Sequence, residues 1–386
     1  MTIHPTSDHS NEMSTVTSHR DRNRTRRRWL LIASALAATG SVWFWRGQLW
    51  SLLVDLQPYV RRRSRAQNPT LIVNRWSGDG KAEELGLVEH ARSLGIRTIL
   101  LEPGDDLTQL AHAAIDDGAD AIGMAGGDGS LGLIAGVAAE RDVPFFCVPV
   151  GTRNHFALDV GLDRDDPLSA LDALVKGDEL RIDLGIVGGR PFLNNVSLGV
   201  YATAVHRDEY RVEKVRTIVE VLTETAADPS EVEALQITGP NGERFSRVPM
   251  LLISNNRYSF AGPPDFGRRT RMDTGVLGIA AATSLPDPDT VTSITLANLT
   301  GWHEWEDDHI QVDSPDSEVL TGVDGEALSF AAPLHIEIRP QGIRLLVPAG
   351  VRPGYLPRAE AVAAQLLDIA AIGPTPSNLR GEFRDA

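Results

Sequence analysis

Apolar residues between positions 70 and 148 switch between short continuous runs and helical spacing, which predicts strands and helices in alternation. The continuous runs predict four buried strands, at 70–73, 96–101, 119–124 and 143–148. Apolar spacing of three or four residues predicts three helices between them, at 83–94, 107–115 and 131–139. A repeated β–α order is typical of a parallel sheet that is covered by helices and joined by right-handed crossovers.

Three loops leave the carboxyl ends of these predicted strands, at 74–81, 126–130 and 149–154. Ligands of open parallel sheets bind just beyond the carboxyl ends of the strands. We therefore expect the three loops to converge on one binding site.

The pattern changes after residue 177, where short β-rich runs replace the β–α alternation. These runs lie at 181–187, 191–197, 234–238, 248–254, 278–282, 309–312, 334–339 and 342–347. Helical spacing is confined to 209–226 and 287–299. The expected fold class is an α/β N-terminal domain with a parallel sheet at 66–177, followed by a mainly antiparallel, β-sandwich-like domain at 178–350. A C-terminal helix and tail are expected at 351–386.

A basic and apolar head precedes these domains. Residues 1–28 are rich in Ser, Thr, Asn and Arg without apolar periodicity, so we expect a disordered basic tail. Residues 29–45 contain no charge and have tryptophans at both ends, and 49–60 could extend them as an amphipathic segment. We predict a membrane-anchor helix at 29–60, with a twin-arginine-like export signal and an ordinary core helix as the alternatives. Arginines on both sides leave its orientation open.

Charge is distributed very unevenly along the 386 residues. Eleven arginines and four acidic residues give residues 1–65 a charge of +7. Because the net charge of the whole chain is −15, the remaining residues carry a charge of −22. The acidic body argues against a nucleic-acid partner, and the basic head favours an anionic membrane surface. Cys147 is the only cysteine, so the chain forms no internal disulfide.

The loop Gly126-Gly127-Asp128-Gly129-Ser130 is the main chemical signal. Its glycines allow backbone N–H groups to approach a phosphate closely. A bare carboxylate would repel that phosphate unless a metal ion bridges the two or the carboxylate orients a reacting group. The glycine spacing also matches a dinucleotide fingerprint, but the next strand ends without the acidic residue that would hold a ribose. Nucleotide phosphate chemistry is therefore favoured over hydride transfer.

Two further segments indicate a phosphate site only when they are considered together with the loop at 126–130. Gly151-Thr152-Arg153-Asn154 follows a strand and opens a helix, where hydroxyl, amide and N–H groups could bind phosphate. Asp324-Gly325-Glu326 places two carboxylates across a glycine, in a pattern suited to a turn at a cleft. Taken alone, a helix cap and a surface turn would be the simpler interpretations.

Together these segments resemble the diacylglycerol kinase catalytic-domain family, which includes bacterial lipid kinases and sphingosine kinases and has a fold related to that of NAD kinase. The loop at 126–130 is similar to the family's GGDGT, 149–157 to its P-x-G-T-x-N-D-x-A, and 323–326 to its D-G-E. Residues 74–78 resemble its N-x-x-S-G loop, 194–199 the strand that opens its second domain, and 271–277 its R-x-D-D-G-x-L motif. All occur in the family's order over about residues 69–350.

The resemblance implies ATP-dependent phosphorylation of the hydroxyl of diacylglycerol or a similar membrane lipid, with ATP and Mg²⁺ as cofactors. It implies that Asp324 is the general base, with Glu326 beside it, and that Asp128 meets the phosphates and Mg²⁺. It also implies that Asp273 helps to hold a structural Mg²⁺. The residues implied at the nucleotide are Asn74, Ser77, Gly126, Gly127, Gly129, Ser130, Gly151, Thr152 and Asn154.

Three residues depart from the family's pattern. Ser130 replaces a threonine and keeps the hydroxyl, Thr274 replaces the second aspartate of R-x-D-D-G, and His155 replaces the aspartate of P-x-G-T-x-N-D-x-A. The last change removes a carboxylate near the nucleotide. The alternatives are therefore a catalytically impaired lipid- or nucleotide-binding regulator and an NAD kinase-type enzyme with a small soluble substrate.

A lipid kinase that uses ATP would be located at the cell membrane, with its catalytic domain facing the cytoplasm, because ATP is intracellular. A homodimer is compatible with the sequence, which does not determine the oligomeric state.

Overall fold

The computed structural model describes residues 62–63, 66–206, 234–258, 268–284, 301–351 and 353–354. The chain divides into two compact units, Met1–Pro58 and Tyr59–Ala386, and every described residue belongs to the second. The expected tail at 1–28, the anchor at 29–60, the helices at 209–226 and 287–299, and nearly all of 351–386 lie outside the described residues. Within the part of the chain that is described, no helix is long and apolar enough to cross a membrane. The anchor at 29–60 therefore stays a prediction.

The first lobe contains the expected parallel sheet. Its strands are β2 (Pro69–Val73), β3 (Arg97–Leu100), β4 (Ala121–Gly126) and β5 (Phe145–Pro149), in the spatial order β3-β2-β4-β5. Every residue of β2, β4 and β5 is buried, which is usual for parallel strands covered on both faces. The continuous apolar runs predicted these four strands to within about two residues at each end.

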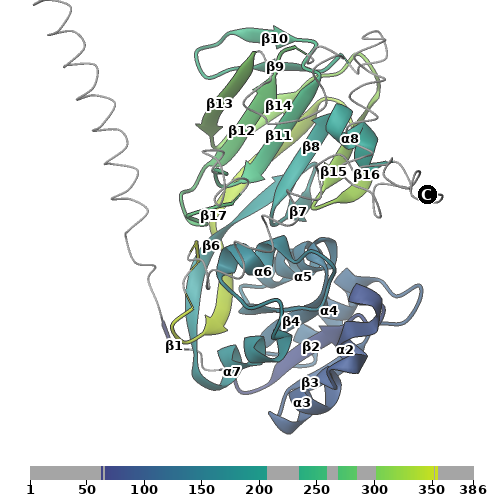
Figure 1. The fold of residues 1–386 in the computed structure, drawn as a ribbon, viewed down its shortest axis with the longest axis vertical. Coiled ribbons are helices and arrows are strands. Elements are labelled where there is room, and N and C mark those ends of the chain that lie inside the picture. Colours follow the sequence, from purple (N-terminus) through teal and green to yellow (C-terminus); the bar gives the residue numbers. More distant parts are fainter. Residues whose placement is uncertain are drawn as a thin grey trace, which may run out of the picture. The chain divides into compact units, whose positions relative to one another are not determined.

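Helices connect these strands and cover both faces of the sheet (Figure 1). They are α2 (Lys81–Glu84), α3 (Leu87–Ser93), α4 (Leu107–Asp116) and α5 (Asp128–Glu140). Right-handed crossovers place α4 and α5 together on one face and α3 on the other, because the chain reverses direction across the sheet after β3. The single helix expected at 83–94 is wrong: Gly86, at φ 59°, takes a left-handed conformation that ends α2 and begins α3.

Two long strands link the first lobe to the second. Strand β6 (Gly177–Val187) pairs antiparallel with β17 (Leu334–Pro348), and Leu345 of β17 pairs in parallel with Phe145 of β5. The sequence predicts two strands at 334–339 and 342–347, but they form one strand with an irregularity between Arg339 and Ile343. The expected domain boundary at 177/178 falls at the first residue of β6.

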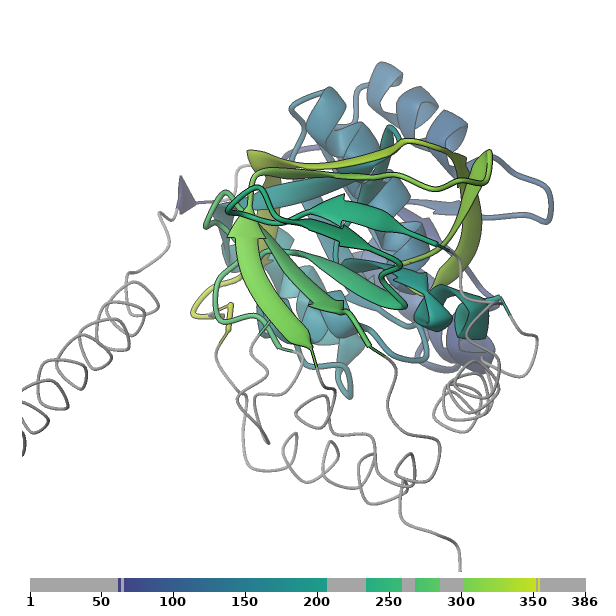
Figure 2. The ribbon, with the colours of Figure 1, turned by 90° about the horizontal axis from the view of Figure 1, so that it is seen from above.

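The second lobe is the expected antiparallel sandwich. One layer is a six-stranded sheet in the order β13-β12-β11-β8-β15-β16. These strands are β8 (Asn195–Gly199), β11 (Met250–Asn255), β12 (Leu277–Ala282), β13 (Trp302–Asp307), β15 (Glu318–Val323) and β16 (Glu326–Ala331). The far halves of β6 and β17, with β7 (Arg190–Phe192) and β14 (His309–Val312), form the other layer. Figure 2 shows the two layers of strands one over the other.

Each lobe has its own apolar core, and β17 contributes to both. Leu345 and Leu346 lie in the first core, whereas Ile336 and Ile338 pack with residues of β8 and β11 in the second. The remaining described elements are β1 (Arg62–Arg63), η1 (Ser77–Gly80), α6 (His155–Val160), η2 (Pro167–Leu171), α7 (Asp172–Lys176), α8 (Val200–Val205), β9 (Gln236–Thr238) and β10 (Arg244–Ser246).

Replacing Gly123 by alanine should destabilise the first lobe. Gly123 of β4 pairs with Phe146 of β5, and a Cβ atom at Gly123 would lie 2.3 Å from the Phe146 ring, which is itself fully buried. Overpacking of this kind costs about 1–3 kcal/mol, so Gly123→Ala should lower the denaturation midpoint. Gly127→Ala is the matched control, since the nearest atom to its Cβ would be 4.0 Å away. Equal midpoints for the two variants would contradict this packing argument.

Candidate active site

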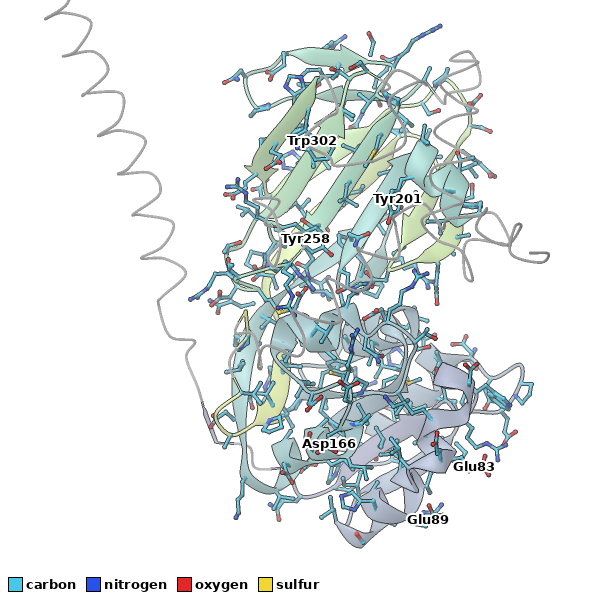
Figure 3. The ribbon with its side chains drawn as sticks, viewed as in Figure 1. Glu83, Glu89, Asp166, Tyr201, Tyr258 and Trp302 are labelled. Atoms are coloured by element: carbon cyan, nitrogen blue, oxygen red, sulfur yellow. The ribbon has the colours of Figure 1, made fainter. Side chains whose placement is uncertain are left out.

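A cavity of about 60 Å³ lies where the two lobes meet. The first lobe lines it with Asp128, Arg153 and His155, and the second lobe lines it with Asn194, Asn195, Ser197, Tyr201, Val205, Asp324 and Gly325. Figure 3 labels Tyr201, one of the second-lobe residues that line the cavity. Two carboxylates from different lobes therefore share one cavity.

The three expected loops do converge on the carboxyl edge of the parallel sheet. The Asn74 N–H donates to the Ala125 carbonyl at 2.9 Å, which ties the first loop to the end of β4. A Cβ atom at Gly78 would lie 2.2 Å from the Val150 carbonyl oxygen, and one at Gly151 would lie 2.5 Å from the Gly127 Cα. Glycine is required at these contacts because the loops touch backbone to backbone.

Asp324 is presented by a tight hairpin turn between β15 and β16. Asp324 and Gly325 both have positive φ, 49° and 84°, as a two-residue turn of this kind requires. The carboxylate is turned inward, where it accepts backbone N–H groups from Leu193 at 2.8 Å, Asn194 at 2.7 Å and Asn195 at 3.1 Å.

Burial raises the pKa of Asp324 to about 7, and the nearby negative charge of Asp128 adds to the rise, against the lowering effect of the three N–H donors. A carboxylate with a pKa near neutrality is suited to accept a proton from a substrate at physiological pH.

Glu326 and Asp324 both lie against α5 of the first lobe. Glu326 Oε2 accepts from Arg190 Nη2 at 2.7 Å, and a Cβ atom at Gly129 would lie 2.1 Å from Glu326 Oε1. A Cβ atom at Gly132 would lie 3.2 Å from Asp324 Oδ2. Gly129 and Gly132, whose spacing matches a dinucleotide fingerprint, therefore leave room for the 324–326 hairpin to approach the first turns of α5.

Asp128 lies in the cavity but is held by the backbone of α6. It is the first residue of α5 and is 8% exposed, and its two oxygens accept the N–H groups of His155 and Phe156, each at 3.0 Å. Asp128 thus caps α6 with its side chain. The expected contacts of Asp128 with phosphate and Mg²⁺ remain a prediction.

The remaining residues expected at the nucleotide divide between structural and accessible positions. Asn154 is buried, and its amide braces its own loop through Gly151 N at 3.0 Å and Gly151 O at 2.6 Å. Gly126 and Gly127 are buried or nearly so between α5 and the loops, whereas Asn74, Ser77 and Ser130 are half-buried and Thr152 is exposed beside them. The sequence cannot distinguish a loop brace from a ligand contact when both use an amide side chain.

Asp273, which the resemblance implies at a structural Mg²⁺, is paired with Arg271 in this structure. Both of its oxygens face the guanidinium of Arg271, with Nε–Oδ1 at 2.7 Å and Nη2–Oδ2 at 2.6 Å. Burial raises the pKa of Asp273, and the hydrogen bonds and positive charge of Arg271 partly offset that rise. Thr274 supplies no second carboxylate. The structural Mg²⁺ at Asp273 stays a prediction, and no step below depends on it.

Two buried polar residues near the cavity are missed by the sequence analysis. Asp183 accepts from Asn256 Nδ2 at 2.8 Å, from Gly275 N at 2.7 Å and from Gln341 N at 2.7 Å, the last inside the β17 irregularity. Arg269 is 1% exposed and lies between the lobes. No local signal singles out Arg269, because Arg268 and Arg271 stand beside it in the sequence.

Comparison with known proteins agrees with this fold. The family described as the diacylglycerol kinase catalytic domain matches residues 68–187. A diacylglycerol kinase of Mycobacterium tuberculosis (strain ATCC 25618 / H37Rv) is 34% identical over 128 residues, which is 32% of this chain and 41% of that protein. A probable lipid kinase YegS-like protein of Pseudomonas fluorescens is 30% identical over 218 residues, which is 55% of this chain and 71% of that protein.

Solved structures share the fold at low identity. A diacylglycerol kinase structure from Bacillus anthracis str. Sterne aligns with a TM-score of 0.53 at 17% identity, covering 75% of this chain and 99% of that one. The chain belongs to the diacylglycerol kinase catalytic-domain family. The match to the Mycobacterium tuberculosis relative spans less than half of that protein's length.

Proposed function

We propose that this protein is an ATP-dependent lipid kinase that phosphorylates the hydroxyl of diacylglycerol or a similar lipid alcohol. The observation that carries the proposal is Asp324, an inward-turned carboxylate with a pKa of about 7 in a cavity that it shares with Asp128. The diacylglycerol kinases and lipid kinases among the relatives support the choice of reaction. The converging loops at the carboxyl edge of the sheet support a nucleotide site on the first lobe.

In the proposed reaction Asp324 acts as the general base. Asp324 takes the proton of the lipid hydroxyl as the hydroxyl oxygen forms a bond to the γ-phosphorus of ATP, and the bond from that phosphorus to the ADP oxygen breaks. Glu326, held by Arg190, borders the acceptor side of the site. Asp128 would hold the Mg²⁺ of the nucleotide, and that ion would neutralise charge on the phosphates.

The proposed membrane association follows from the head of the chain. The predicted anchor at 29–60 and its flanking arginines would hold the protein at an anionic membrane surface, with the described lobes facing the cytoplasm. Anchoring confines the enzyme to the surface that holds its substrate.

Loss of the Asp324 carboxylate should abolish phosphate transfer. The test is full-length protein in detergent–lipid micelles with radiolabelled ATP and a total lipid extract, followed by identification of the labelled lipid. Asp324→Asn should lower kcat by at least about 100-fold, because general-base catalysis contributes about 10²–10⁴-fold. Asp316→Asn, the same change on an exposed residue of the same lobe, should keep wild-type activity.

NAD serves in that assay as a soluble acceptor. Labelling of NAD but of no lipid would contradict the lipid-kinase proposal, as would full activity of Asp324→Asn.

The rate of transfer should rise with pH through about 7. Asp324 can act as a base only when it is deprotonated, and its pKa lies well above the usual carboxyl value because of burial and the charge of Asp128. The logarithm of kcat/KM, which reports the pKa values of the free enzyme, should therefore rise with unit slope below pH 7 and level off above it. In Asp128→Asn the loss of a neighbouring negative charge should move the midpoint to lower pH, whatever the absolute rate. A midpoint near 4 in the wild type would contradict this assignment.

A regulator that binds lipid or nucleotide without catalysis is the second candidate. It is favoured by one observation: His155 lines the cavity where the family's motif has an aspartate. Nucleotide binding by equilibrium dialysis, together with the transfer assay, separates the two. We expect transfer by the wild type and a smaller change in kcat for His155→Asp than for Asp324→Asn. Nucleotide binding with no transfer by either the wild type or His155→Asp would favour the regulator.

A further inference from the structure

Arg269 makes one of the most heavily hydrogen-bonded contacts between the two lobes. Its guanidinium is fully buried and donates four hydrogen bonds. Nε donates to Asp159 Oδ2 at 2.7 Å, Nη1 to the carbonyls of Leu193 at 2.5 Å and Asn255 at 2.9 Å, and Nη2 to Asn194 Oδ1 at 2.9 Å. The guanidinium carbon also lies 5.8 Å from the centre of the Tyr258 ring.

On the first-lobe side, Arg269 is connected to Asp128 through one short helix. Asp159 belongs to α6, and the first two N–H groups of α6 are those that Asp128 accepts. The helix is therefore fixed by Asp128 at its beginning and by Arg269 near its end.

On the second-lobe side, Arg269 is connected to Asp324 through a single stretch of backbone. Leu193 offers its carbonyl to Arg269 and its N–H to Asp324. Asn194 offers its side-chain oxygen to Arg269 and its N–H to Asp324. The residues that hold the Asp324 carboxylate are thus held in turn by Arg269.

We propose that Arg269 is a positioning residue, which fixes the backbone of residues 193–194 against Asp324. It thereby determines the position of the Asp324 carboxylate relative to Asp128 across the cavity. This inference rests on the proposed function for its kinetic consequence, but the geometry it describes is independent of the reaction. Among the described residues, Arg269 is hydrogen-bonded to neither carboxylate of the cavity, and its hydrogen bonds reach each of them through one intermediate segment.

A purely structural role for Arg269 makes a different prediction. Breaking a buried ion pair usually destabilises a protein wherever the pair is located. Lysine would keep a cation near Asp159, but a single ammonium group lacks the planar fork that reaches Asp159, Leu193 and Asn194 together. Arg269→Lys therefore preserves the charge and removes the positioning.

The experiment measures hydrogen–deuterium exchange and steady-state kinetics on the full-length protein with Arg269→Lys. The amides of residues 193–195 should exchange at least about tenfold faster than in the wild type, since Arg269 no longer holds this segment against its acceptor, Asp324. With the lipid and ATP, kcat should fall about 10- to 100-fold, as a small displacement of a reacting group can cost about 100-fold. The KM for ATP should change less than about twofold, because none of the hydrogen bonds of Arg269 goes to the converging loops of the first lobe.

Arg344→Lys is the matched control. Arg344 on β17 pairs with Glu179 on β6 through two hydrogen bonds of 2.9 Å, and neither residue lines the cavity. This variant should leave both kcat and the exchange at 193–195 as in the wild type.

Asn194→Ala is the second variant, for the case in which Arg269→Lys fails to fold. It removes the side-chain oxygen that Arg269 binds and keeps the backbone N–H that Asp324 accepts. It should also accelerate exchange at 193–195 and lower kcat.

The outcomes separate the two proposals. Wild-type exchange at 193–195 in the variants that fold would overturn the positioning role, and a lowered melting temperature with unchanged kcat would do the same. A wild-type protein that transfers no phosphate would contradict the proposed function alone, because the exchange measurement still decides whether Arg269 positions the segment.

Discussion

The pairing of β6 with β17 is the constraint on which the rest of the structure depends. It is a long antiparallel ladder, with one irregularity between Arg339 and Ile343, that begins beside β5 in the first lobe and ends inside the sandwich of the second. A shared ladder of backbone hydrogen bonds leaves little freedom for one lobe to rotate against the other. It therefore brings the Asp324 hairpin to the same place on α5, where Gly129 and Gly132 leave room for it. The cavity between Asp128 and Asp324 is a consequence of that placement.

The pattern of hydrophobic residues was sufficient to predict the strands that are buried along their whole length. Strands β2, β4 and β5 could be predicted because fully buried strands have continuous apolar runs. The break at Gly86 was missed because the apolar spacing continues across it, and the pattern does not register a left-handed backbone. The sequence predicted two strands in place of β17 because Pro340, Gln341 and Gly342 have the composition of a turn. In the structure they form an irregularity within one strand, where the Gln341 N–H donates to Asp183.

The candidate site was predictable only in its local parts. The Asp-Gly turn at 324–325 and the converging glycine loops follow from turn chemistry and from the topology of a parallel sheet. Arg269 and Asp159 could not be assigned, because they are 110 residues apart and meet only through tertiary packing. Asp128 could be placed at the site, but its bonds to the first N–H groups of α6 depend on how the next loop folds.

The position of the last strand also bears on how the chain folds. Phe145 and Leu345 are neighbours in one sheet, although 200 residues separate them along the chain. The first lobe therefore lacks the strand that lies beside β5, and β5 keeps an open edge, until residue 345 has been synthesised. Contacts of such long range slow folding. Residues 68–187, which carry the family's most recognisable segment, are on this account a unit of sequence similarity rather than a unit of folding.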